Sequence, residues 1–207
     1  MKSDEELVED VNHLMPCRDW QTLDNPLYAF KRVAKGARIA KPKHIFLIVG
    51  ESIPQWSMDP LYMNFNICPG LRDFASDVHT ACVPNFLPAG NVSRPSISSL
   101  ISGIYDSGME LNEKEIFCNN TLPTALAAQI KRLGYQTIYW YGGNSSSGNF
   151  TKYGKAQGFD RIENATEFCG SQAPQTWLGV YDHVFLEEAA KRIVAMEEPT
   201  FHFVYTT

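Results

Sequence analysis

The sequence predicts an α/β fold, with a mostly parallel central sheet flanked by helices. Short runs at 44–49, 135–141 and 200–206 are rich in apolar, aromatic and β-branched residues, as buried strands are. Segments with the helical spacing of apolar residues lie between these runs. Strands that alternate with helices favour a parallel sheet, because each helix returns the chain to the start of the next strand.

Residues 1–42 differ from the rest and are expected to form an appendage, a helix followed by a basic linker. Ser3 or Asp4 is the expected N-cap, and Pro16 ends the helix. The apolar stripe of this helix comprises Leu7, Val8, Val11 and Leu14. A basic cluster follows it: Lys31, Arg32, Lys35, Arg38, Lys41 and Lys43. This cluster is either a solvated linker or a segment that lies near an anionic membrane surface.

The first half of the remaining chain begins with the strand 44–49. A loop rich in Pro, Met and aromatic residues follows at 53–69, and 69–77 has the pattern of a short helix. The apolar stretch 78–83 could form a further strand. An amphipathic helix is expected from Ser93 to Gly103, because glycine is the preferred residue just after a helix end.

The second half repeats the alternation of helix and strand. A helix is expected from Thr121, with Leu122, Leu126, Ile130 and Leu133 on one face and Gly134 as its stop. The strand 135–141 and a Gly/Ser/Asn-rich loop at 142–149 come next. That loop is either a flexible linker or a substrate loop at a strand tip, and its place between two helical patterns favours the second. A helix at 180–197 and a strand at 200–206 complete the pattern.

Composition describes a globular protein with a sizeable core: 207 residues, 44% apolar and 20% charged. The net charge of −5 gives no electrostatic footprint for nucleic acid. The chain has neither an apolar stretch long enough to span a membrane nor a signal peptide at Met1, so the targeting segment of an exported parent protein would lie outside this chain.

The five cysteines form no C-x-x-C pair, which argues against a zinc knuckle or a thioredoxin motif. A Cys118–Cys169 bridge and free thiols are both compatible with the spacing.

Glu51 and Ser93 are the residues that point most directly to chemistry. Glu51 follows the strand 44–49, and Ser93 begins the expected helix. Sites in open α/β sheets form beyond the carboxyl ends of the strands, and helix N-termini bind anions. Taken singly, these residues are most often a solvated carboxylate and a helix cap. Together they suggest half of a metal-assisted phosphoryl- or sulfuryl-transfer site.

The spacing around both residues resembles a known superfamily. The run 93–103, S-R-P-S-I-S-S-L-I-S-G, is similar to the nucleophile segment of sulfatases, C/S-x-P-S-R-x-x-L-L-T-G. A strand followed by Gly50-Glu51 resembles the first metal strand of the phosphoglycerol and phosphoethanolamine transferases, whose branch includes lipoteichoic acid synthase. Further segments resemble that branch at 134–144, 149–160, 177–182 and 201–207. Both groups belong to the alkaline phosphatase superfamily, and the resemblance covers about 43–207.

The resemblance implies that Ser93 is the nucleophile and that Ser93 and Glu51 bind a divalent metal ion, Mn, Mg or Zn. The superfamily's other ligands, an Asp-His pair and a further His, would lie beyond Thr207. Residues 43–207 would then be the N-terminal portion of a sulfatase-like catalytic domain, truncated before its end and inactive alone.

The resemblance also implies a substrate: a membrane-lipid head group or an envelope glycan. The catalytic domain would lie on the periplasmic or extracellular side of a cell membrane. Arg94, Tyr141, Asn144 and Asn149 are candidate substrate-binding residues, and Arg94 could clamp a substrate anion.

Departures from the family patterns bear on the reaction. Sulfatases carry two adjacent Asp after the first strand where this chain has Glu51 alone, and Ile97 stands where formylglycine formation needs Arg. Both departures favour phosphoryl transfer over sulfatase chemistry. Lipoteichoic acid synthases have His, Trp and Arg at the places of Tyr141, Gly148 and Phe150, which argues against their glycerol phosphate substrate. The alternatives are a sulfatase, a phosphodiesterase in which water takes the intermediate, and a non-catalytic binding relative.

Other polar residues have structural interpretations. His202, between two phenylalanines in the last strand, is expected to be packed rather than to bind metal. Asp106, Asp160 and Asp182 are expected to cap turns or helices.

Overall fold

The computed structural model describes residues 3, 5–6, 9, 39–83, 86–144 and 148–207. The chain divides into two units, Met1–Ala40 and Lys41–Thr207. In the first unit, Glu6 N donates to Ser3 Oγ at 3.3 Å and Ser3 N donates to Glu6 Oε2 at 2.7 Å. This reciprocal pair is a capping box, so Ser3 is a helix cap as predicted. The predicted apolar stripe, Pro16 and most of the basic cluster lie outside the described residues.

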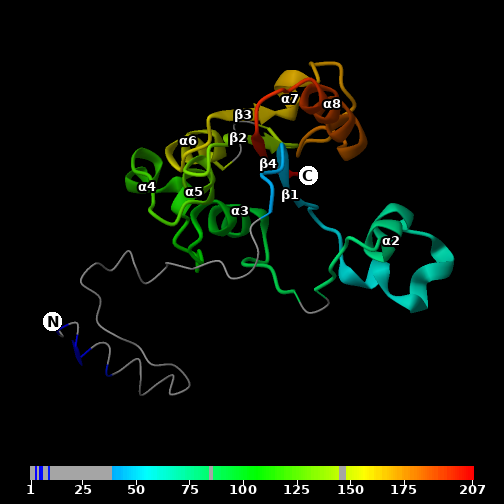
Figure 1. Ribbon diagram of the computed structural model, residues 1–207, viewed down its shortest axis with the longest axis horizontal. Helices are drawn as coiled ribbons and strands as arrows, with labels where there is room; N and C mark the ends of the chain where they lie inside the picture. Colours follow the sequence, from blue (N-terminus) through cyan, green and yellow to red (C-terminus); the bar gives the residue numbers. More distant parts are fainter. Residues whose placement is uncertain (1–2, 4, 7–8, 10–38, 84–85, 145–147) are drawn as a thin grey trace. The chain divides into compact units, whose positions relative to one another are not determined.

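The second unit is built on a sheet of parallel strands (Figure 1). The strands are β1 (His44–Val49), β2 (Gln136–Tyr141), β3 (Arg161–Asn164) and β4 (Thr200–Tyr205). Their order across the sheet is β1-β4-β2-β3. The predicted α/β class and the predicted strands at 44–49, 135–141 and 200–206 are therefore confirmed. The edge strand β3 was not predicted, because its four residues include Arg161, Glu163 and Asn164 and lack a strand pattern.

Helices and short 3₁₀ turns connect the strands. The helices are α2 (Pro69–Ser76), α3 (Ser93–Ser102), α4 (Glu115–Asn119), α5 (Leu126–Lys131), α6 (Phe150–Ala156), α7 (Ala165–Phe168) and α8 (Asp182–Val194). The 3₁₀ turns are η2 (Gln55–Met58), η3 (Pro60–Phe65) and η4 (Leu111–Glu113). Gly103 ends α3 with φ +71°, and a Cβ there would lie 2.9 Å from the Thr124 carbonyl oxygen. Glycine is therefore required at this helix end.

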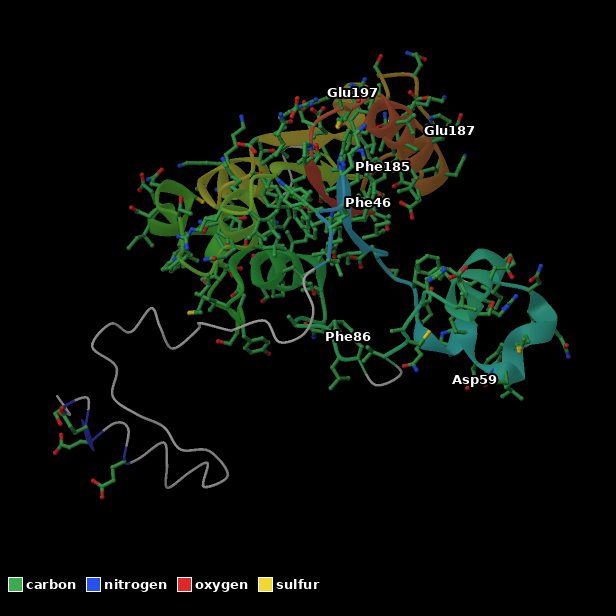
Figure 2. The ribbon with its side chains drawn as sticks, viewed as in Figure 1. Phe46, Asp59, Phe86, Phe185, Glu187 and Glu197 are labelled. Atoms are coloured by element: carbon green, nitrogen blue, oxygen red, sulfur yellow. The ribbon has the colours of Figure 1, made fainter. Side chains whose placement is uncertain are left out.

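Alternate residues of β2 and β4 pack against helices on opposite faces of the sheet. One face of β4, with Phe201, Phe203 and Tyr205, packs on α3, α5 and α6. The other face packs on α7 and α8 (Figure 1). Figure 2 shows Phe185 on the sheet side of α8 and Glu187 on its outer side. This packing on both faces holds the sheet and α3 in fixed positions, so the start of α3 lies beside the ends of the strands.

His202 belongs to the α8 face and is fully buried. Trp140 Nε1 donates to His202 Nδ1 at 3.1 Å, and His202 Nε2 lies 3.1 Å from His44 Nδ1. Because Nδ1 accepts, the neutral ring carries its proton on Nε2 and donates it to His44. Burial, with a smaller contribution from His44, lowers the pKa of His202 to about 4. The expectation of a packed histidine is confirmed.

The predicted strand at 78–83 is wrong. These residues form a turn and irregular chain, and Val78 and Val83 are 90% and 71% exposed. An apolar run becomes a strand only where a neighbouring strand completes its hydrogen bonds. β4, from the far end of the sequence, pairs with β1 on one side and β2 on the other.

The start of one predicted helix needs correction, and the alternatives left open for two cysteines are decided. The helix expected from Thr121 begins only at Leu126, because Leu122 N donates to Gln157 Oε1 at 2.9 Å and Thr121 Oγ1 donates to the Ala156 carbonyl. Cys118 and Cys169 are free thiols, so the possible bridge between them is not formed.

The aspartates have structural roles, but only Asp106 caps a turn as predicted, whereas Asp160 and Asp182 bind groups far away in the sequence. Asp106 accepts from the backbone of Glu110 and Leu111, and Asp160 accepts from Thr137 N and Lys131 Nζ. Asp182 is the first residue of α8 and accepts from the backbone N–H of Thr207.

Candidate active site

The end of β4 places Glu51 beyond the carboxyl end of β1. Val49 pairs with Tyr205 across the two strands, and Thr206 N donates to the Val49 carbonyl at 3.1 Å. Glu51 N then donates to Thr206 Oγ1 at 2.9 Å. The sheet thus fixes the Glu51 backbone at the edge where sites of parallel sheets form.

The start of α3 places Ser93. Val92 is the N-cap in an extended conformation, and Ser93 is the first helical residue. Ser93 Oγ donates to Glu51 Oε2 at 3.0 Å and makes no capping hydrogen bond. The common interpretation of this serine as a helix cap is therefore wrong. The structure brings Glu51 and Ser93 into direct contact.

The Glu51 carboxylate accepts hydrogen bonds from three hydroxyl groups. Ser93 and Tyr205 both donate to Oε2, at 3.0 Å and 2.5 Å, and Ser52 donates to Oε1 at 3.2 Å. Burial, and next the facing Glu51, raise the pKa of Tyr205 well above its usual value. Tyr205 is therefore a protonated donor at neutral pH, and the arrangement suits an ionised carboxylate.

A pocket of about 560 Å³ opens beside this cluster. It is lined by Glu51, Ser52, Val92, Ser93, Arg94, Tyr141, Asn144, Phe150, Trp177, Leu178, Tyr205, Thr206 and Thr207. The predicted residues Glu51, Ser93, Arg94, Tyr141 and Asn144 therefore share one pocket. The predicted Asn149 does not line it.

Asn149 has a different place in the structure. Its amide nitrogen donates to the Asn112 carbonyl at 3.0 Å and to Cys118 Sγ at 3.3 Å. Its φ is +54°, a conformation that asparagine tolerates better than most residues. These contacts join the start of α6 to the η4–α4 segment and do not point to substrate.

The remaining predicted residues offer different chemistry to the pocket. The Arg94 side chain is 56% exposed, and its Nη1 lies 3.9 Å from Glu113 Oε1. A pair this long and exposed is weak, so the guanidinium keeps capacity to bind an anion. Tyr141 is buried at the end of β2 and packs edge-on against Phe150.

Several pocket residues escaped the sequence reasoning, above all Tyr205, Thr206 and Trp177. Tyr205 and Thr206 reach Glu51 only because β4 lies beside β1, and no local pattern reports strand order. Trp177 is 89% exposed on a loop in which Thr176 N donates to the Gly179 carbonyl at 2.8 Å. Gly179 in turn pairs with Gly143 after β2. An aromatic residue within a Gly-containing turn was the available signal.

The oxygens of Glu51 and Ser93 fit part of a cation site. Two oxygens that bind one ion at about 2.0–2.2 Å in perpendicular directions lie about 3 Å apart. Glu51 Oε2 and Ser93 Oγ are separated by 3.0 Å. Within the described part of the chain, no group of three or more His, Cys, Asp or Glu side chains could hold a metal. A complete site therefore needs ligands from elsewhere.

Comparison with solved structures finds partial similarity. A protein in the alkaline phosphatase superfamily from Vibrio parahaemolyticus is 23% identical over 54% of this chain and 28% of that chain, with a TM-score of 0.46. The lipoteichoic acid synthase LtaP from Listeria monocytogenes is 14% identical over 58% of this chain and 29% of that chain, with a TM-score of 0.48. This chain thus spans less than a third of either protein.

A search of curated proteins finds no match. Comparison with protein families does find one. The family model described as Sulfatase matches residues 43–207, which comprise all four strands and the Glu51–Ser93 pair. The chain therefore belongs to the sulfatase family.

Proposed function

We propose that this chain is part of a metal-dependent enzyme that transfers or hydrolyses a phosphoryl group of a membrane-lipid head group or envelope glycan, with Ser93 as nucleophile. The contact between Ser93 Oγ and Glu51 Oε2 in the pocket carries the proposal. It places a potential nucleophile beside a carboxylate at the carboxyl ends of the strands, where open α/β sheets bind their ligands.

The chain's own residues would act in a defined order. The Ser93 hydroxyl donates its hydrogen to Glu51, which leaves the oxygen lone pairs for an electrophile. As Ser93 Oγ bonds to phosphorus, its proton would pass to solvent and the P–O bond to one alcohol of the diester would break. That alcohol's oxygen would leave with the bonding electron pair and take up a proton from solvent. The oxygen of a hydroxyl acceptor or of water would then bond to phosphorus and lose its proton, while Ser93 Oγ leaves with the electron pair of its P–O bond and regains a proton. A bound divalent ion would lower the pKa of the hydroxyl and stabilise charge on the phosphoryl oxygens.

Arg94 and Asn144 would orient the substrate. Both line the pocket beside Ser93, and the Arg94 guanidinium can hold two oxygens of a phosphate at once. Tyr141 would form the buried wall at the end of β2.

A sulfatase is the second candidate, and the family match favours it. At the position where formylglycine formation needs Arg, however, Ile97 is fully buried in the core. We therefore propose an unmodified serine as the nucleophile.

The substrate class implies a place in the cell. We propose that the catalytic domain faces the periplasmic or extracellular side of a cell membrane and is attached through segments outside this chain. Within the described residues, no helix has the length and apolar character required to cross a membrane.

Parallel assays of the full-length protein would test this function. With Mn²⁺ present, bis(p-nitrophenyl) phosphate should be turned over much faster than p-nitrophenyl sulfate. Mass spectrometry should find an unmodified Ser93 at rest and a phosphate-bearing Ser93 after quenching. Faster sulfate release with an aldehyde at residue 93 would support the sulfatase, and turnover of neither ester would support a binding relative.

A further inference from the structure

We propose that Tyr205 is a positioning residue for the candidate metal site, and that its hydroxyl holds the Glu51 carboxylate in the orientation in which it shares an ion with Ser93. The inference rests on the proposed function, since it assigns a role within the same site.

The hydrogen bond from Tyr205 is the shortest that Glu51 receives in the described structure. Its 2.5 Å compares with 3.0 Å from Ser93 and 3.2 Å from Ser52. Short hydrogen bonds from a hydroxyl to a carboxylate are charge-assisted and stronger than neutral ones. Tyr205 therefore contributes the main restraint on the carboxylate.

The sheet makes Tyr205 a rigid support. The residue is 3% exposed, and its ring packs near Phe203 and Tyr141, with centroids 6.3 Å and 6.4 Å away. Register with Val49 sets its height relative to Glu51. Ser52, by contrast, is exposed and has a φ of +56°. Glu51 is therefore held by one hydroxyl that is fixed in the core, that of Tyr205, and by one that lies at the surface, that of Ser52.

Tyr205 and Ser93 donate to the same oxygen, and this sharing gives Tyr205 a role during reaction. When Ser93 bonds to phosphorus it loses its hydroxyl proton, and its hydrogen bond to Glu51 is lost with it. The hydrogen bond from Tyr205 does not depend on Ser93. It can hold the carboxylate in place while the nucleophile is covalently occupied.

Packing alone does not require this hydroxyl. Tyr139, on the same face of the neighbouring strand β2, is fully buried in the same core cluster, and its hydroxyl has no hydrogen-bond partner among the described residues. The core around these strands thus accepts a phenol ring without using its hydroxyl. At Tyr205 the hydroxyl is directed at the Glu51 carboxylate, to which Ser93 also donates.

The test is a calorimetric Mn²⁺ titration of the full-length protein and its Tyr205→Phe variant, which keeps the ring. Loss of the hydrogen bond that orients a metal ligand should raise the Kd for Mn²⁺ roughly 10- to 100-fold. Tyr139→Phe, the matched loss of a buried phenol hydroxyl, should leave Kd unchanged. Activity of Tyr205→Phe should recover as Mn²⁺ is raised by the same factor, which a general loss of structure would not allow.

A second measurement needs no substitution at Tyr205. In protein labelled with ¹³Cζ-tyrosine, addition of diamagnetic Zn²⁺ should shift one tyrosine resonance, and this resonance should persist in Tyr141→Phe. If Glu51→Gln abolishes Mn²⁺ binding, the metal site stands and the positioning role can be judged separately. That role is then overturned by a wild-type Kd for Mn²⁺ in Tyr205→Phe, or by the absence of any tyrosine resonance that shifts with Zn²⁺. Unchanged Mn²⁺ binding in Glu51→Gln instead overturns the metal site and the proposed function with it.

Discussion

The Ser93 hydroxyl donates a hydrogen bond to Glu51, and it accepts no capping hydrogen bond from the backbone of α3. The helix therefore starts without help from this side chain, with Val92 as its N-cap. As a result, the chemical role of Ser93 can be separated from the stability of α3.

Ser93→Ala should reduce turnover of a phosphodiester roughly 10³-fold or more, because no other hydroxyl of the described pocket replaces the nucleophile on α3. The lost hydrogen bond to a charged group should lower the free energy of unfolding by only about 1–3 kcal/mol. Steady-state kinetics and urea unfolding of the full-length protein measure both effects. Ser93→Thr, which keeps a hydroxyl, should retain part of the activity.

Ser96→Ala is the matched control for Ser93→Ala. Ser96 lies one turn further along α3, and its hydroxyl donates to the Gly90 carbonyl at 2.9 Å. Its removal should cost about 1 kcal/mol of stability and leave turnover near wild type. Full activity in Ser93→Ala would end the proposed mechanism.

At the residue scale, the sequence could predict only those site residues that local elements position. Glu51 follows a strand and Ser93 starts a helix, and both features are visible in short windows of sequence. Tyr205 and Thr206 act through the adjacency of β1 and β4, which are about 150 residues apart. Asn149 was predicted from its neighbourhood in a polar loop, but backbone turning directs its side chain to Asn112 and Cys118.

At the scale of elements, β4 carries a titratable group in its interior. The ordinary pKa of histidine is about 6.5, and the pKa of His202 in the fold is about 4. Between these values the unfolded chain binds the proton more readily than the folded one. Stability from neutral His202 is thus fully present above about pH 6.5 and is lost as pH falls toward 4.

Because of His202, we expect the free energy of unfolding to fall by about 2 kcal/mol when the pH is lowered from 7 to 5. His202→Asn, whose amide oxygen can accept from Trp140 Nε1, should remove that part of the pH dependence. Urea unfolding at both pH values measures it. His79→Asn, at an exposed position, should keep the wild-type dependence. An equal pH dependence in His202→Asn and the wild type would contradict the expected burial of a neutral ring.

We expect the conformation of the loop that carries Trp177 to be disturbed by any side chain at position 179. A Cβ there would overlap the Gly142 carbonyl oxygen and lie 2.7 Å from Gly143 Cα, and backbone cannot move aside as a flexible side chain can. Gly179→Ala should therefore lower kcat/KM for the phosphodiester about tenfold or more and destabilise the fold by about 1–3 kcal/mol. Kinetics and thermal unfolding would measure these changes.

Gly70→Ala provides the comparison for Gly179→Ala. Gly70 lies in α2, and a Cβ there would have no atom within 4 Å. Alanine in a helix should stabilise by up to about 1 kcal/mol and leave kinetics unchanged. Equal effects of the two substitutions would show that the contact between 142–143 and Gly179 does not position the loop.

Elements with strong periodicity could be predicted, and those defined by their neighbours could not. The runs that became β1, β2 and β4 are mostly apolar or aromatic, and β2 and β4 are almost fully buried. The run 78–83 has similar composition but no strand beside it. The first turn expected for α5 is absent because its backbone and hydroxyl groups bind the end of α6.

At the scale of the whole molecule, a cation at the site would join the sheet to α3, because Glu51 follows β1 and Ser93 begins α3. Mn²⁺ at about 100 times its Kd should therefore raise the free energy of unfolding of the full-length protein by about 2.7 kcal/mol. Thermal unfolding with and without EDTA measures this shift. In Glu51→Gln the melting temperature should not respond to Mn²⁺, and an equal response there would place the ion elsewhere.

The strand order also sets when the site can form during synthesis. Among the described strands, β1 pairs only with β4, and β4 emerges from the ribosome about 150 residues later. At about 5–20 residues per second, β1 waits roughly 8–30 s without its partner. Its apolar side chains and open edge are exposed to misassociation during that interval. Chaperone capture of nascent chains should therefore be greatest for lengths that end before Thr200.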